Sequence, residues 1–123
     1  MIVASDPHEG LGQVIDNGHC MRHCQVLHGV PHSSALRRGA RVNDAGDLPC
    51  GVIIATFNAN GRYANKTDGS SHIAVLIERR ADGSLLVVDQ WKGQPVHERV
   101  IRDKRGAGTA NNDASRFYIV ETA

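Results

Sequence analysis

Cysteine and histidine alternate in the segment "HCMRHC" (residues 19–24), and these two residue types support two kinds of chemistry. Both are common ligands of zinc, and together they also form the nucleophile and base of cysteine hydrolases. The pairs His19/His23 and Cys20/Cys24 have the i, i+4 spacing at which two side chains of a helix can share a metal ion. The segment therefore predicts either a metal site or a catalytic thiol.

A single metal ion cannot take all four side chains of this segment, because the two pairs point about 100° apart on a helix. A closed zinc site would need further ligands from elsewhere in the chain. The remaining candidates form no ligand-spaced pair such as C-x-x-C: His28, His32, Cys50 and His97. We therefore expect no metal and no cofactor, and a metal-binding or interaction module around residues 19–28 stays open as the non-enzymatic alternative.

As a nucleophile, Cys20 is the better placed of the two cysteines. It falls in the first turn of a predicted helix, where unpaired backbone N–H groups and the helix dipole favour a thiolate and can bind an oxyanion. Cys24 lies one turn deeper, on an apolar stripe with Leu27, and is expected to be a core residue. A thiolate nucleophile also needs a histidine, which in turn needs an orienting group.

His72 and Asp89 are the candidates for those two roles. His72 begins the apolar segment "HIAVLIE", and Asp89 follows four apolar residues in "LLVVDQW", where a buried carboxylate needs a partner. If a two-residue turn at Asp82 and Gly83 joins the strands, His72 and Asp89 share one face but lie about four residues apart along it. A longer loop that shifts the pairing by two to four residues would bring them together. An edge position or a structural ion pair is the alternative for Asp89.

The pattern of apolar residues predicts one helix and a sheet. A helix capped by Asn17 or Gly18 and ended by Gly29 precedes five predicted strands, at residues 51–57, 72–78, 84–91, 95–101 and 116–121. This order indicates a single α+β domain over residues 1–123, with the helix packed on an antiparallel sheet of about five strands. Three long polar loops are expected to line a cleft: 30–50, 58–71 and 102–115.

The composition excludes some classes of protein. The chain has 14 Lys and Arg against 13 Asp and Glu, so neither nucleic acid nor a membrane is expected as a partner. No apolar run approaches the roughly 20 residues of a membrane span, and the N-terminus lacks the basic and apolar regions of a Sec signal. The chain has three cysteines, an odd number. This fits a protein that is made in the cytoplasm and has a free thiol better than it fits a disulfide scaffold.

The order of these motifs resembles the NlpC/P60 and CHAP cysteine peptidases, which are papain-like peptidoglycan hydrolases. The segments "GHCMRHC", "GDLPCGVIIATF", "SHIAVLIE" and "LLVVDQW" follow one another over residues 17–91 in the order of that family's catalytic motifs. The resemblance implies a papain-like core with Cys20 as the nucleophile, His72 as the base and Asp89 as the orienting residue. The family's cysteine is usually followed by apolar residues; Arg22 and His23 depart from that pattern, and we expect both to face outward.

A bare catalytic chain without a signal or a wall-anchoring module is similar to the amidase effectors of type VI secretion. This resemblance implies an antibacterial effector that is made in the cytoplasm and delivered to the periplasm of a target cell. It also implies a cognate immunity protein that plugs the active site. The bond hydrolysed would be either the D-Glu–diaminopimelate bond of the peptidoglycan stem or the diaminopimelate–D-Ala cross-link, and the small size favours the cross-link. We expect a monomer.

Three residues beside the proposed triad are expected to contact the substrate: Trp91, Gln90 and His19. Trp91 could be a platform for a sugar or a stem peptide, and a position in the core is the alternative. Gln90 is also a second candidate for orienting His72. The same cysteine–histidine chemistry would serve an acyltransferase or a protein deamidase, because it does not specify the group that accepts the acyl chain.

Overall fold

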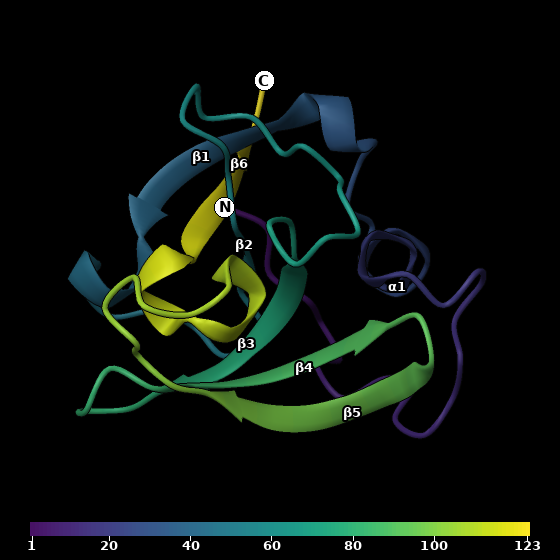
Figure 1. Cartoon of the computed structure of the whole chain (residues 1–123). Coiled ribbons are helices and arrows are strands. Elements are labelled where there is room, and N and C mark those ends of the chain that lie inside the picture. The colour runs from purple at the N-terminus through teal and green to yellow at the C-terminus, as the bar shows by residue number, and fades with distance from the viewer.

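The computed structural model describes residues 1–123 and places one helix against a six-stranded sheet (Figure 1). Helix α1 spans Cys20–His28, and the strands are β1 Leu36–Arg41, β2 Ile53–Ala55, β3 Ile73–Arg79, β4 Leu85–Trp91, β5 Gln94–Ile101 and β6 Tyr118–Thr122. Neighbouring strands are antiparallel, and their order across the sheet is β1-β6-β2-β3-β4-β5. The predicted α+β class is confirmed.

The sixth strand, β1, lies inside the segment 30–50 that the sequence indicates as a loop, so the expectation of about five strands is one too few. β1 is an edge strand, and Leu36 is the only buried residue in it. Its sequence "LRRGAR" therefore lacks the alternation of apolar residues by which a strand is recognised. Gly39 suits the position because a Cβ there would come within 2.6 Å of the Ile119 carbonyl oxygen on β6.

The sheet carries apolar side chains on both faces. The cluster on one face includes Met21 and Cys24 of α1. The cluster on the other face includes Phe117 and is covered by two short 3-10 turns, Ala110–Asn112 and Ala114–Arg116. Figure 1 shows α1 and these yellow turns on different sides of β3. The start of β3 therefore lies between the helix and the C-terminal loop.

Helix α1 begins later than the sequence predicts, because its N-cap is His19 and not Asn17 or Gly18. The His19 side chain makes no capping bond, and Asn17 accepts the His19 N–H through Oδ1 at 3.0 Å. The predicted end at Gly29 is confirmed, since this residue adopts a left-handed φ of 69° and its N–H bonds to the Cys24 carbonyl. No helix has the length and apolar character needed to span a membrane.

His23 is fully buried, so the expectation that it faces solvent is wrong. It lies one helical turn before Leu27 and therefore falls at the border of the apolar stripe. Its ring packs edge-on against His28, with 5.3 Å between the ring centroids. The Nε2 atoms of both rings are buried without a hydrogen-bond partner. Burial lowers the pKa of His23 to about 4, so the side chain is neutral at pH 7.

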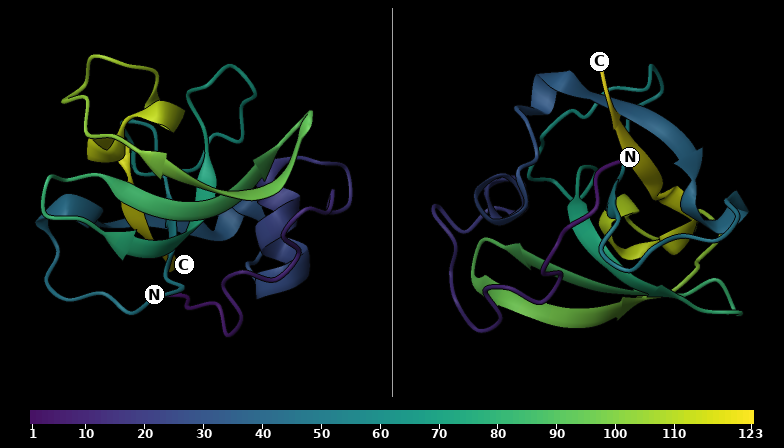
Figure 2. Two further views of the ribbon diagram at one scale, coloured as in Figure 1. Left: turned by 90° about the horizontal axis from the view of Figure 1, so that it is seen from below. Right: turned by 180° about the vertical axis from the view of Figure 1, so that it is seen from behind.

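The N-terminal segment, purple in Figure 2, crosses the sheet before it reaches α1. It covers the edge of β5, where Gly12 donates its N–H to Val96 and Val96 donates its N–H to Gln13. The same segment is fixed to β4 at Ile15, which bonds through its N–H and its carbonyl to the side chain of Gln90. These contacts hold the residues before Cys20 against the sheet.

Candidate active site

His72 and Asp89 are in direct contact. His72, the residue before β3, shares a hydrogen bond of 2.6 Å between its Nε2 and Oδ2 of Asp89 on β4. The side chains are only 4% and 0% exposed, so the bond is shielded from water. Because Nε2 is engaged, Nδ1 is the ring nitrogen that can exchange a proton with Cys20.

Two local features bring His72 and Asp89 together. The hairpin loop has three residues and not two, since Arg80 donates its N–H to the Ser84 carbonyl, and this moves the pairing by one residue. A β-bulge in β3, between Leu76 and Glu78, moves it by one more. The register beyond the bulge sets His72 two residues from Asp89 on the same face of the sheet, in place of the four that a two-residue turn would give.

Arg99 on β5 is a second partner of Asp89, which the sequence pattern does not predict. Its Nε donates to Oδ2 of Asp89 at 2.9 Å. Its two terminal nitrogens reach the C-terminal loop, at the Asn112 side chain (2.9 Å) and the Asn111 carbonyl (3.0 Å). The guanidinium carbon also lies 5.0 Å from the centre of the Trp91 ring. Arg99 therefore joins the buried carboxylate to the loop beside it.

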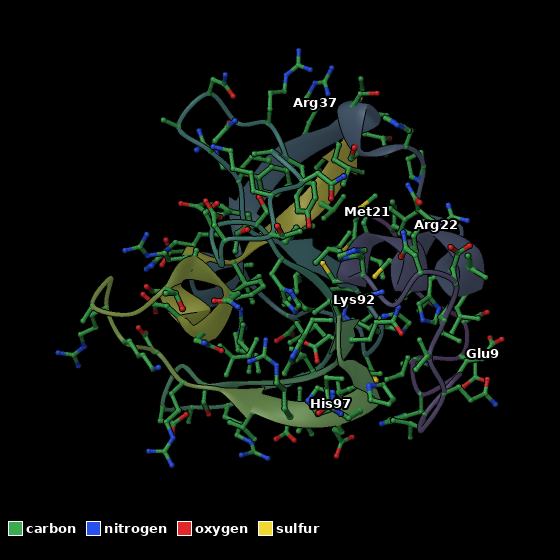
Figure 3. All side chains as sticks on the ribbon, turned by 45° about the vertical axis from the view of Figure 1, so that its right-hand side comes forward. Glu9, Met21, Arg22, Arg37, Lys92 and His97 are labelled. Carbon is green, nitrogen blue, oxygen red and sulfur yellow. The ribbon has the colours of Figure 1, made fainter.

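His97 completes the surroundings of Asp89. It lies opposite Asp89 in the β4–β5 register, where Nδ1 contacts the Asp89 carbonyl at 3.2 Å. Its ring also packs edge-on against Trp91, with 4.9 Å between centroids. Figure 3 labels His97 on β5. Oδ1 of Asp89 has no hydrogen bond, so both side-chain hydrogen bonds to the carboxylate are made at Oδ2.

Cys20 is the first residue of α1 and is half-buried. The Tyr63 hydroxyl lies 3.6 Å from its Sγ. The backbone N–H groups of Cys20, Met21 and Arg22 make no hydrogen bond, as expected for the first turn of a helix without a side-chain cap. These free donors lie at the end of α1 that carries the thiol, and they can bind an oxyanion formed there.

The ionisation of the three side chains favours a thiolate–imidazolium pair. Burial opposes the charged form of Cys20, but hydrogen bonding and charge attraction from His72 outweigh it and lower the pKa of the thiol. Burial likewise opposes the charged form of His72, but Asp89 and Cys20 raise its pKa to about 9. Despite its own burial, the pKa of Asp89 is lowered by His72 and Arg99. At neutral pH His72 is therefore protonated and Asp89 ionised, and the thiolate form of Cys20 is favoured over that of a free cysteine.

Tyr63 and Arg99 are the site residues that the sequence does not predict. Burial raises the pKa of Tyr63 well above its ordinary value, so it stays protonated and donates to the thiolate. Tyr63 carried a weak signal, as the only aromatic residue of the polar loop 58–71. Arg99 carried a clearer one, because it lies two residues before the buried Ile101 and so points to the same face of the sheet.

Cys20 and His72 open onto a cleft with a volume of about 360 Å³, which we call the first cleft. Residues of the loops 58–71 and 102–115 form its walls, while the loop 30–50 contributes no residue to it. Its rim carries His19, Lys92 and the 40% exposed Trp91. Figure 3 shows Lys92 beside the start of α1. The structure thus brings two of the three expected substrate contacts, His19 and Trp91, to the cleft.

Gln90 is not at the cleft. It is fully buried, and its amide donates to the carbonyls of Ile15 and His19, at 2.9 Å each, and accepts the Ile15 N–H at 3.0 Å. These bonds occupy the amide and fix the chain just before Cys20. The expectation of a substrate contact, or of a bond to His72, is therefore corrected to a supporting role for the helix start.

The loop 102–115 is held together by the buried carboxylate of Asp113. One oxygen accepts the backbone N–H groups of Lys104 and Ser115, each at 3.0 Å, and the other accepts the Gly106 N–H at 2.7 Å. With the two bonds from Arg99, this carboxylate fixes the wall of the first cleft from within.

The other two thiols have different surroundings. Cys24 is fully buried, and burial raises its pKa well above the ordinary value, so it stays a neutral core side chain as predicted. Cys50 is exposed in the segment before β2. All three cysteines are free. No group of three or more His, Cys, Asp or Glu side chains is placed to hold a metal ion.

Comparison with known proteins points to one family. The profile described as Dae2, domesticated amidase effector 2, matches residues 1–120. A type VI secretion amidase effector 2 protein of Salmonella typhi is 34% identical over 120 residues, which cover 87% of this chain and 88% of that protein. A domesticated amidase effector 2 of Ixodes scapularis is 36% identical over 85 residues, 68% of this chain and 55% of that protein.

A solved structure of a type 6 secretion amidase effector 2 (Tae2) has the same fold. It superposes with a TM-score of 0.83 at 28% identity and covers 98% of this chain and 94% of its own. The expected papain-like architecture is therefore confirmed. The resemblance to the amidase effectors of type VI secretion is confirmed as well.

Proposed function

This chain belongs to the domesticated amidase effector 2 family, and from that premise we propose that it is a peptidoglycan amidase with Cys20, His72 and Asp89 as its catalytic triad. The observation that carries the assignment is the buried 2.6 Å bond between His72 and Asp89, next to a thiol at the start of a helix. Hydrolysis of an amide needs a nucleophile, a proton donor for the leaving amine and a site for the oxyanion. The first cleft offers all three.

In the first half of the reaction, the Cys20 thiolate attacks the carbonyl carbon of the scissile amide. The negative charge moves to the carbonyl oxygen, which the free N–H groups of the first helical turn stabilise. His72 then gives the proton on Nδ1 to the nitrogen of the leaving amine, and the carbon–nitrogen bond breaks. The products of this half are a free amine and a thioester on Cys20.

In the second half, neutral His72 takes a proton from a water molecule, and the resulting hydroxide attacks the thioester. The carbon–sulfur bond breaks, a carboxylate leaves, and Cys20 returns as a thiolate beside protonated His72. Asp89 keeps Nε2 protonated throughout and holds the imidazole in plane. The oxygen of the water stays in the product, its first proton is on His72, and its second proton passes to solvent as the product acid ionises.

An acyltransferase or a deamidase would use the same three residues. The two reactions differ from hydrolysis of peptidoglycan only in the acceptor or in the amide attacked. The names of the relatives, which are amidase effectors, favour the amidase.

Digestion of purified sacculi, followed by mass analysis of the fragments, tests the proposal. The wild-type protein should release fragments with a new amine and a new carboxylate, and we expect cleavage of the diaminopimelate–D-Ala cross-link rather than of the D-Glu–diaminopimelate bond. Cys20→Ala should release none, while Cys50→Ala, which removes an exposed thiol outside the first cleft, should match the wild type. Equal release by Cys20→Ala would refute the assignment of the nucleophile.

We also propose that the enzyme is delivered to the periplasm of a target cell and that an immunity protein covers the first cleft. The support is the type VI secretion named in its relatives. Expression with an added Sec signal should cause lysis, and expression without it should not, because peptidoglycan lies outside the inner membrane. Cys20→Ala with the signal should be harmless. Equal toxicity without the signal would favour the deamidase or acyltransferase.

A further inference from the structure

A second cleft adjoins the first and is not used by the proposed chemistry. It has a volume of about 560 Å³ and shares Lys66 and Ser71 with the first cleft. It lies between the same two loops, on the side away from Cys20, which does not line it. Besides uncharged polar residues, its walls carry apolar and cationic side chains: Phe57, Ala64, Ala110, Tyr118, Lys66 and Arg116.

The charge around these two clefts is one-sided. The chain is almost neutral as a whole, with 13 Asp and Glu, yet none of them lines either cleft. Lysine or arginine occurs in both: Lys66 and Lys92 in the first, Lys66 and Arg116 in the second. Concave walls of one charge raise the local concentration of an oppositely charged ligand. The composition of the walls therefore fits an anionic substrate.

Lys66 is the cation without an internal partner. It forms no hydrogen bond or ion pair within the molecule, whereas Arg116 donates to the Gly106 carbonyl at 2.7 Å and lies 3.5 Å from Asp113. The nearby carboxylate of Asp68 is already engaged by the N–H and hydroxyl of Ser70. The Lys66 ammonium is thus available to a ligand at the junction of the two clefts.

We propose that the second cleft binds a free carboxylate of the peptide substrate, with Lys66 as the residue that recognises it. This inference rests on the proposed peptidoglycan amidase, whose substrate peptides carry carboxylates besides the amide that is cut. The scissile amide lies in the first cleft at Cys20, and the chain continues past Lys66. The apolar walls made by Phe57 and Tyr118 accept small aliphatic side chains, and the ammonium forms a charge-assisted bond to the carboxylate.

The test uses a set of cross-linked dimers of stem peptides, which contain both candidate amides, in which one free carboxylate at a time is replaced by a carboxamide. For the wild type, one of these replacements should lower kcat/KM by roughly tenfold, the usual effect of losing one charge-assisted bond. Lys66→Met keeps most of the side-chain length but removes the charge. It should therefore hydrolyse the acid and amide forms of that peptide with equal kcat/KM. The control is Lys104→Met, which changes an exposed lysine of the loop 102–115 outside both clefts. It should prefer the acid form of the peptide over the amide form as strongly as the wild type does.

A second variant tests the cleft itself. Ala64→Trp fills the second cleft from an exposed position, so it should fold normally and lose the same discrimination. Ala107→Trp, exposed on the neighbouring loop, is its control. If the wild type cuts none of the peptides, the proposed function fails. If it cuts them but Lys66→Met and Ala64→Trp keep the wild-type discrimination, or if no replacement matters, the second cleft does not bind a carboxylate.

Discussion

Arg99 and His72 bond to the same oxygen of Asp89. Their nitrogens, Nε and Nε2, lie 2.9 Å and 2.6 Å from Oδ2, while Oδ1 has no hydrogen bond. Two partners on one oxygen fix the rotation of the carboxylate and therefore the plane of the imidazole. The positive charge of Arg99 also favours the ionised form of Asp89, and its pKa is accordingly lowered. The orientation of His72, which precedes β3, thus depends on Arg99 of β5.

Arg99→Met should reduce both activity and stability. It leaves a buried carboxylate with one partner fewer and releases the loop at Asn111 and Asn112, so the free energy of unfolding should fall by about 2–3 kcal/mol. Arg99→Lys keeps the charge but carries its donors on a single nitrogen, which cannot reach all three acceptors, so it should recover only part of each loss. Urea unfolding and kcat/KM check this. Arg102→Met, an exposed neighbour, is the control, and wild-type values for Arg99→Met would contradict the role.

The two cysteines of α1 should separate activity from stability. Cys20→Ser should stay folded and lose activity, because a serine hydroxyl is not ionised at neutral pH. Cys24→Ala should retain activity and lose about 1–2 kcal/mol of stability through the small cavity it leaves in the core. Thermal unfolding and a peptidoglycan digestion assay measure the two effects. A folded but inactive Cys24→Ala beside an active Cys20→Ser would reverse the assignment.

His72 and Cys20 should behave as one unit. Because neither residue can act in the proposed reaction without the other, the double variant Cys20→Ala/His72→Ala should be no less active than Cys20→Ala alone. The measurement is kcat/KM for the two single variants and the double variant. Effects that multiply would show that the two residues act independently and would remove His72 from the mechanism.

Tyr63→Phe should shift the pH dependence of the thiol. The hydroxyl bonds to Sγ of Cys20 and lowers its pKa, so its loss raises the pKa and moves the ascending limb of thiolate reactivity to higher pH. The rate of alkylation of Cys20 as a function of pH measures this directly, best in a Cys50→Ala background that removes the exposed thiol. Activity should be reduced at acid pH and restored at alkaline pH. An unchanged alkylation profile would mean that the hydroxyl does not act on the thiolate.

His23 should make the protein less stable in mild acid. Its pKa is about 4 in the folded chain against 6.5 as the ordinary value, so between these values the unfolded chain binds a proton that the folded chain does not. Stability from this residue is therefore complete above pH 6.5 and lost as the pH falls, by about 2 kcal/mol at pH 5. His72, whose pKa is raised from 6.5 to about 9, contributes stability that is present below pH 6.5 and lost as the pH rises through 9, so its contribution changes little over this range.

A His23→Leu variant isolates this effect. Urea unfolding at pH 7 and pH 5 gives the change in the free energy of unfolding for each protein. The loss on going to pH 5 should be smaller for the variant than for the wild type, by about 2 kcal/mol. The comparison cancels the contribution of His72, which both proteins contain. Equal losses would show that the buried ring titrates normally.

The sequence predicted the elements of the site better than its geometry. Periodicity is local, so it located α1 and five of the six strands, and residue types within these elements pointed to Cys20, His72 and Asp89. The register that joins His72 to Asp89 depends on a bulge in β3 and on the length of a turn, which residue types alone do not determine. The sequence could still predict that His72 and Asp89 lie on the same face of the sheet. The turn and the bulge together shift the pairing by two residues, and a shift of two leaves every side chain on the same face.

The misses have a common physical origin in contacts between distant parts of the chain. β1 owes its place to pairing with β6, some 80 residues later, and not to an apolar pattern of its own. Gln90 is a polar side chain that looks available, but the N-terminal segment folds over it and uses its amide. Arg99 acquires its role only when β5 pairs with β4.

The carboxylate of Asp113 has a consequence for the thermodynamics of substrate binding. Because it bonds to the backbone at Lys104, Gly106 and Ser115, the loop is ordered by folding itself. The conformational entropy of this loop is lost when the protein folds. It is therefore not lost again when a substrate binds. A substrate therefore meets a wall that is already ordered before it binds.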